Sequence, residues 1–148
     1  MADHLRDQIR AAVVTALTGL TTTSTRVYSS RAQDMQPANL PGLRIYTTEE
    51  SVEIESLGIN RRRHRTLTLM VEACVKATSA PEDTIDDICK EVEIALDTAN
   101  TLGGLCKWIE PTQFELELDG EADKSIAVGR MTFEVHYYTA KGSPDVPN

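Results

Sequence analysis

The sequence predicts an α+β domain in which two helices pack on one face of a mostly antiparallel mixed β-sheet of about four to five strands, with a long charged hairpin loop. Two segments place apolar residues every three or four positions, which is typical of amphipathic helices. Several others alternate apolar and polar residues, which is typical of half-buried strands. These segments follow one another as helix, three strands, helix and two strands.

The length of 148 residues suits a single core. With 41% hydrophobic and 26% charged residues, the composition is that of a folded globular protein. We expect one domain over residues 1–140. Residues 141–148 contain Gly142, Pro144 and Pro147 and no apolar anchor beyond Val146, so we expect a flexible C-terminal tail.

The first half of the chain begins with an apolar stripe between Asp3 and Leu20 that predicts a helix. A threonine-rich stretch then leads to a brief strand over 26–28. A polar loop that includes residues 33–39 follows, and the alternation after Pro41 predicts a second strand over 43–47.

A charged segment occupies residues 49–65. Its acidic and basic residues are Glu49, Glu50, Glu53, Glu55, Arg61, Arg62, Arg63 and Arg65, with Gly58 between the two groups. We interpret it as a projecting, mobile hairpin loop. Clustered arginines can recruit nucleic acid, but the run lacks interleaved aromatic residues. The arms can also pair charge with charge. We favour a third interpretation, a loop that binds a partner protein.

The second half contains the clearest strand, over residues 66–77, in which apolar and polar side chains alternate. Ser79 and Glu82 have the spacing of a capping box, and the following apolar stripe predicts a helix that ends before Gly103. Strands over 108–118 and 126–139, joined by a turn at 119–123, predict a closing hairpin.

A search for catalytic chemistry finds no active site. The three histidines, His4, His64 and His136, have no partner at the spacing of a triad. The acids Glu82, Asp83, Asp86 and Asp87 are dense enough to consider for acid–base work or for a hard cation. They lie in the first turns of a helix, where the dipole favours negative charge, so a solvated acidic face is the simpler reading. We therefore expect no catalytic residues, no cofactor and no metal.

The remaining features restrict the partners. A formal net charge of −8 argues against electrostatic binding of nucleic acid as the main activity. Apolar runs are far shorter than a membrane span requires, and no signal peptide is evident. The three cysteines are widely spaced, so we expect reduced, structural thiols.

The ordered series of segments resembles the tail terminator family of long, non-contractile-tailed phages, whose best-known member is lambda's minor tail protein U. The residues that carry the resemblance are the opening Leu5-Arg6-x-x-Ile9-x-x-Ala12-Val13, the segment Leu40-Pro41-Gly42-Leu43-Arg44-Ile45-Tyr46 with the acidic stretch after it, and the closing Tyr137-Tyr138-Thr139. The resemblance runs from Leu5 to about Thr139. The arginine run at 61–65 and the loop at 33–39 depart from the family's pattern.

The resemblance implies a structural, non-enzymatic virion protein. Its members form a hexameric ring that caps the head-proximal end of the tail tube, ends tube polymerisation and joins the tail to the head. The implied partners are other copies of the chain, the tail tube protein and the head-completion or connector proteins. DNA is expected to pass through the lumen without specific binding, and no membrane is involved. Assembly is expected in the bacterial cytoplasm, and the final location at the head–tail junction of the virion.

On this reading we assign two candidate surfaces. The charged residues of 49–65 named above are expected to contact the tube or a neighbouring subunit. The helix acids Glu82, Asp83, Asp86 and Asp87, together with His136 and Tyr138, are expected at the ring interface or the lumen. Two alternatives stay open: a head–tail connector or neck subunit with a similar fold, and a small acidic-site enzyme or ligand-binding domain.

Overall fold

Five strands form one open sheet in the order β1-β2-β3-β5-β4. The computed structural model describes residues 3–29, 40–59, 61–77, 80–119 and 126–148. The elements are α1 (Leu5–Leu17), β1 (Val27–Tyr28), β2 (Gly42–Ile54), β3 (Arg62–Lys76), α2 (Pro81–Thr98), a short 3-10 helix (Leu102–Gly104), β4 (Trp108–Asp119) and β5 (Ile126–Ala140). β1 pairs with β2 in parallel, and the other pairs are antiparallel. The α+β prediction is confirmed.

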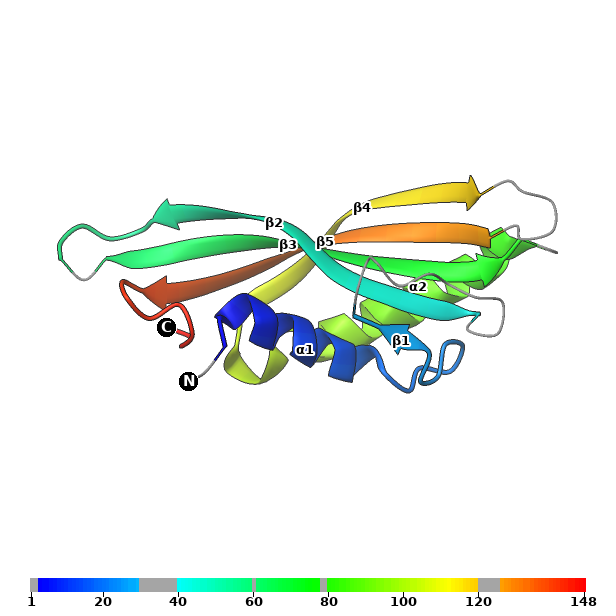
Figure 1. Cartoon of the computed structure of the whole chain (residues 1–148), viewed down its shortest axis with the longest axis horizontal. Coiled ribbons are helices and arrows are strands. Elements are labelled where there is room, and N and C mark those ends of the chain that lie inside the picture. Colours follow the sequence, from blue (N-terminus) through cyan, green and yellow to red (C-terminus); the bar gives the residue numbers. More distant parts are fainter. Residues whose placement is uncertain (1–2, 30–39, 60, 78–79, 120–125) are drawn as a thin grey trace.

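Both helices lie on the same side of the strongly twisted sheet (Figure 1). We call this side the helix-bearing face and the opposite side the open face. Between helices and sheet lies the core, because alternate residues of β3 and β5 turn their apolar side chains toward the helices. Leu69, Phe133, Val135 and Tyr137 are fully or almost fully buried there, and Leu5 of α1 packs into the same cluster.

One glycine allows α2 to approach the sheet closely. A Cβ atom at Gly129 of β5 would lie 2.4 Å from the Cγ2 atom of Ile85 in α2. Real side-chain atoms do not approach so closely, so a larger residue here would push the helix away from the sheet.

The expected mobile loop over 49–65 is wrong in its extent. β2 continues to Ile54 and β3 already begins at Arg62, so most of this segment is a strand-paired hairpin arm. Arg62 is paired with Ala140 and Arg65 with Tyr137. The backbone of β3 in this arm also pairs with β5. A local pattern of charges does not reveal pairing with a strand so far away in the sequence.

Pro111 interrupts β4 without ending it. The register between β4 and β5 shifts between Pro111 and Gln113, a bulge that absorbs the proline, which has no N–H to donate to the ladder. The expected loop at 33–39 and the expected cap at Ser79 lie outside the described residues, as does the turn after Asp119. α2 begins at Pro81, with Ala80 as the N-cap.

The last eight residues contact the rest of the domain through main-chain atoms. The Leu5 amide donates to the Pro144 carbonyl at 2.9 Å, the Gln8 Nε2 donates to the Asp145 carbonyl at 2.9 Å, and the Asn148 amide donates to the Tyr138 carbonyl at 3.0 Å. The lack of apolar residues beyond Val146 gave no sign of these hydrogen bonds. The expected flexibility of residues 141–148 stays a prediction.

Candidate functional site

The charged hairpin divides into a buried base and an exposed outer part. At the base, the side chains of Glu50 and Arg65 are 4% and 9% exposed, so neither is available to a partner. Further out, Glu53, Glu55 and Arg61 are exposed. Glu49 is exposed at the base, while Arg62 and Arg63 are half-buried. The candidate partner surface therefore excludes two of the eight residues assigned to it.

Glu50 is the centre of an internal polar network on the helix-bearing face. Its Oε2 atom lies 2.9 Å from Nη1 of Arg65 and 2.9 Å from Nη1 of Arg6 in α1. The Tyr137 hydroxyl donates to the other carboxylate oxygen, and Arg65 Nε donates to Thr139 Oγ1 at 2.9 Å. Burial raises the pKa of Tyr137, and the Glu50 carboxylate raises it further. This network ties α1 to β2, β3 and β5, so its role is to hold the subunit together.

The outer part of the hairpin combines charge with apolar side chains. Arg62 pairs with Glu55 at 3.2 Å, and Arg61 Nε donates to the Gly58 carbonyl at 3.1 Å. Four large apolar residues lie exposed beside these charges: Val52, Ile54, Leu57 and Ile59. The charge-based reading missed them, although Val52 and Ile54 already alternate with acids in the sequence.

An aromatic row crosses the open face on β3, β5 and β4. The rings of His64 and Tyr138 stack with centroids 4.7 Å apart, and the rings of Trp108 and His136 stack at the same separation. His64 Nε2 lies 2.9 Å from His136 Nδ1, which joins the two stacks. The Arg62 guanidinium sits 4.0 Å above the Tyr138 ring. Of these five residues, the assigned surfaces included Arg62, His136 and Tyr138.

A second charged network lies further along the open face. Glu72, which is 1% exposed, pairs with Arg44 at 2.8 Å and with Arg130 at 2.8 Å. Arg130 also reaches Glu115 and Glu117 at 3.3 and 3.1 Å. Bonding to Glu72 is the main cause that raises the pKa of Arg130. The open face is therefore a charged, largely self-paired surface.

The helix acids lie on the other side of the sheet. Glu82, Asp83, Asp86 and Asp87 are exposed along α2. Because α2 covers the helix-bearing face, these four are separated by the sheet from His136 and Tyr138. The structure thus does not bring the six residues assigned to the ring interface or lumen together on one surface. Within the described residues, no cluster of three or more His, Cys, Asp or Glu side chains has the arrangement of a metal site.

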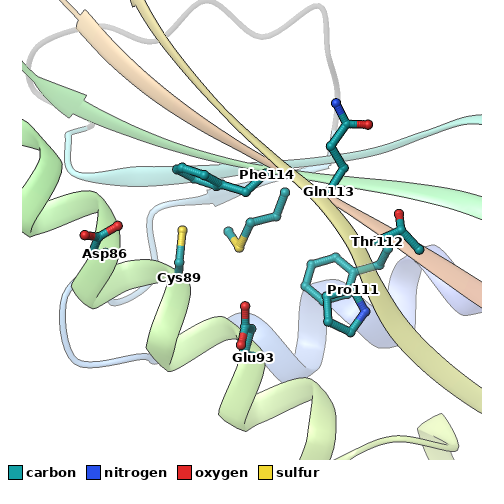
Figure 2. Close-up of a pocket in the computed structure, with 9 residues that line it drawn as sticks. Asp86, Cys89, Glu93, Pro111, Thr112, Gln113 and Phe114 are labelled. Carbon is teal, nitrogen blue, oxygen red and sulfur yellow. The ribbon is translucent and has the colours of Figure 1, made fainter.

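A groove between α2 and β4 has a cavity volume of about 340 Å³. Figure 2 shows Asp86, Cys89 and Glu93 of α2 facing Pro111 and Phe114 of β4 across it. Burial, followed by the nearby carboxylates of Asp86 and Glu93, raises the pKa of the Cys89 thiol to about 12, so this thiol is not an activated nucleophile.

The remaining thiols are equally inert. Burial raises the pKa of Cys74 to about 11 and that of Cys106 to about 12. All three cysteines are free. Among the described helices, none is long and apolar enough to cross a membrane. The candidate binding features among the described residues are therefore the hairpin, the groove between α2 and β4, and the edge strands β1 and β4.

In the part of the chain that the structure describes, this α+β subunit presents hairpins, edge strands and charged faces, which are surfaces of the kind through which structural proteins assemble. The model of the phage minor tail protein U family matches residues 4–137, and the chain belongs to this family. It is therefore a structural protein of a phage tail and a component of the virion. No curated protein matches the sequence. A solved structure, titled "Virion of native gene transfer agent (GTA) particle", is similar at a TM-score of 0.48 and 17% identity, covering 92% of this chain and 92% of that chain.

Proposed function

We propose that this chain is the tail terminator of its phage. A ring of about six copies forms on the head-proximal end of the tail tube, stops the addition of further tube subunits and presents its other face to the head-completion proteins. The observation that carries the proposal is the family match, which spans almost the whole domain. The exposed hairpin and the edge strands β1 and β4 are surfaces suited to such contacts.

The charge of the chain fits a conduit for DNA. Six copies at −8 carry a formal charge of about −48. Acidic side chains that line a bore repel phosphates, so DNA passes without being held. The open face pairs much of its charge internally through Arg130, whereas the α2 acids are exposed. The exposed side of α2 outside its groove with β4, which carries Glu82, Asp83 and Asp87, is accordingly the better candidate for the lumen.

The decisive experiment removes the gene from the phage and examines the particles by electron microscopy. We expect abnormally long tail tubes that do not join heads, and tubes of normal length when purified protein is supplied during assembly. Tails of normal length that still fail to join heads would favour a connector or neck subunit instead. Normal particles would contradict both functions.

A second experiment tests the hairpin as the contact with the tube or a neighbour. Replacing Arg61, Arg62 and Arg63 together by alanine is expected to weaken tail capping while the subunit stays folded, because these side chains lie outside the buried base. The matched control removes three exposed lysines elsewhere, Lys76, Lys90 and Lys107. Unchanged phage yield from the arginine variant would count against the hairpin.

A further inference from the structure

Two apolar surfaces of this chain lie uncovered. The first, which we call the tip surface, consists of Val52, Ile54, Leu57 and Ile59 at the end of the β2–β3 hairpin. Leu57 is 96% exposed and Ile59 is 83% exposed. Beyond Glu50, which Arg6 of α1 reaches, Val52 and Ile54 continue the helix-bearing face without a helix above them. Exposed apolar side chains gathered at one place mark a binding surface.

The second surface is the groove between α2 and β4, together with the apolar side of β4 beyond it. Phe114 lines this groove, and Leu116 and Leu118 follow on the same side of the strand. These three side chains are between 43% and 58% exposed, because α2 covers β5 and leaves the edge strand bare. We call this the α2–β4 groove. Its α2 wall carries the exposed acids Asp86 and Glu93.

The two surfaces match in chemistry. Beside the tip surface, Arg63 lies across from Ile54 on the same face and Arg61 is exposed next to it. Of the nearby acids, Glu53 lies across from His64 on the open face and Glu55 is paired with Arg62. The α2–β4 groove is flanked by the exposed acids Asp86 and Glu93. Apolar side chains in both surfaces leave water on contact, and the opposite charges at the rim set the orientation. An edge strand with an apolar side is also a ready acceptor for a hairpin from another molecule.

The positions of the two surfaces exclude contact within one molecule. The hairpin tip lies at one end of the long axis, and β4 runs toward the other end (Figure 1). Contact between these two surfaces therefore requires a second copy of the same chain. Repetition of one contact between two unlike surfaces generates a ring when the rotation closes.

We propose that the tip surface of one copy docks into the α2–β4 groove of a second copy. This inference rests on the proposed function only in that the repeated contact is the one that builds the ring. It names the two surfaces that meet, and it excludes a symmetric contact in which tip meets tip or groove meets groove.

Crosslinking of two protein pools tests the pairing. One pool carries Leu57→Cys and the other carries Leu116→Cys, each with Cys89→Ser so that the native thiol in the groove does not interfere. One pool is isotopically labelled, the two are mixed in equal amounts, and a short bismaleimide joins neighbouring thiols. Mass spectrometry then measures the three possible dimers. We expect the mixed dimer to exceed each like dimer by about tenfold, because only a mixed pair places a tip thiol beside a groove thiol when unlike surfaces meet.

The matched control replaces Leu57→Cys by Val146→Cys, because Val146 is also an exposed apolar residue but lies outside the tip surface. Mixed with the Leu116→Cys pool, it is expected to give mixed and like dimers in random proportions. Random proportions in the Leu57→Cys experiment, an excess of like dimers, or no crosslinked product would each overturn the proposed contact.

Failure of this contact and failure of the terminator function give different results. If the mixed dimer does not form but gene deletion still produces overlong tubes, the chain is a terminator whose ring uses other surfaces. If the mixed dimer forms but tube length is normal without the gene, the chain self-associates through these surfaces and has another task in the tail.

Discussion

Two segments of this chain are densely charged in sequence, but they differ in burial: the structure buries part of the first and exposes the acids of the second. The hairpin segment over 49–65 and the start of α2 over 82–87 are both rich in ionisable side chains. In the first, the side chains of Glu50 and Arg65 are buried and bonded to each other, and Glu50 also accepts a hydrogen bond from the Tyr137 hydroxyl. In the second, Glu82, Asp83, Asp86 and Asp87 face solvent.

The difference shows that charge density alone does not predict exposure. A buried charge persists when other elements supply partners for it, and the partners of Glu50 come from α1, β3 and β5. The α2 acids need no such partners, because water solvates them and the helix dipole favours them. Mutations should therefore be costly at Glu50 and Arg65 of the first segment and almost silent at the exposed acids of the second.

The largest effect is expected from Glu50→Ala. This change leaves Arg65 buried without its carboxylate, and breaking a buried ion pair in this way costs about 3–5 kcal/mol. Urea or thermal unfolding monitored by circular dichroism measures the loss. The control is Glu53→Ala, three residues along the same strand but exposed, with a change within about 0.5 kcal/mol. Equal effects of the two variants would remove the distinction between the base and the outer part of the hairpin.

A smaller loss is expected from Tyr137→Phe, which removes the hydroxyl that donates to Glu50. The carboxylate keeps both arginines, so the loss is that of one hydrogen bond to a charged group, about 1.5–3 kcal/mol. Tyr138→Phe is the control, because that ring lies on the open face. If the two variants unfold at the same denaturant concentration, the Tyr137 hydroxyl contributes nothing to stability.

Alkaline pH should weaken the buried network through ionisation of Tyr137. The pKa of Tyr137 is raised above the ordinary value of 10.0, so the folded state holds this proton where the unfolded state has lost it. The free energy of unfolding is therefore full below about pH 10 and falls as the pH rises toward the folded pKa.

Unfolding titrations across this range should show a steeper loss for the wild type than for Tyr137→Phe. The buried thiols contribute to the loss in both proteins, so they cancel in the comparison. Parallel stability curves for the two proteins would mean that Tyr137 ionises as easily in the folded state as in the unfolded chain.

The smallest effect is expected from neutralising the α2 acids. Asp83→Asn and Asp87→Asn should each change the free energy of unfolding by less than about 0.5 kcal/mol, because both side chains are exposed. Chemical unfolding at low and high salt measures this. A loss comparable to that of Glu50→Ala would show that these acids have a structural partner.

Much of the fold could be predicted from local patterns. Periodicities of three to four residues predicted helices ending near Leu20 and before Gly103, and the helices end at Leu17 and Thr98. Alternation predicted closing strands over 108–118 and 126–139, and these strands are Trp108–Asp119 and Ile126–Ala140. The boundaries of β2 and β3 could not be predicted, because their outer parts are charged and their pairing depends on β5, far away in sequence. The sequence also did not show which candidate residues share a face: His136 and Tyr138 lie across the sheet from the α2 acids with which they were grouped.

By itself, the sequence determined the class of the fold, the order of its elements and the family, because each depends on local periodicity or on the succession of motifs along the chain. Tertiary structure alone decided which charges are buried, which apolar residues stay uncovered and which side chains share a face. Such outcomes depend on partners that meet across the sheet, and the free energy of a charged or apolar group is set by what surrounds it.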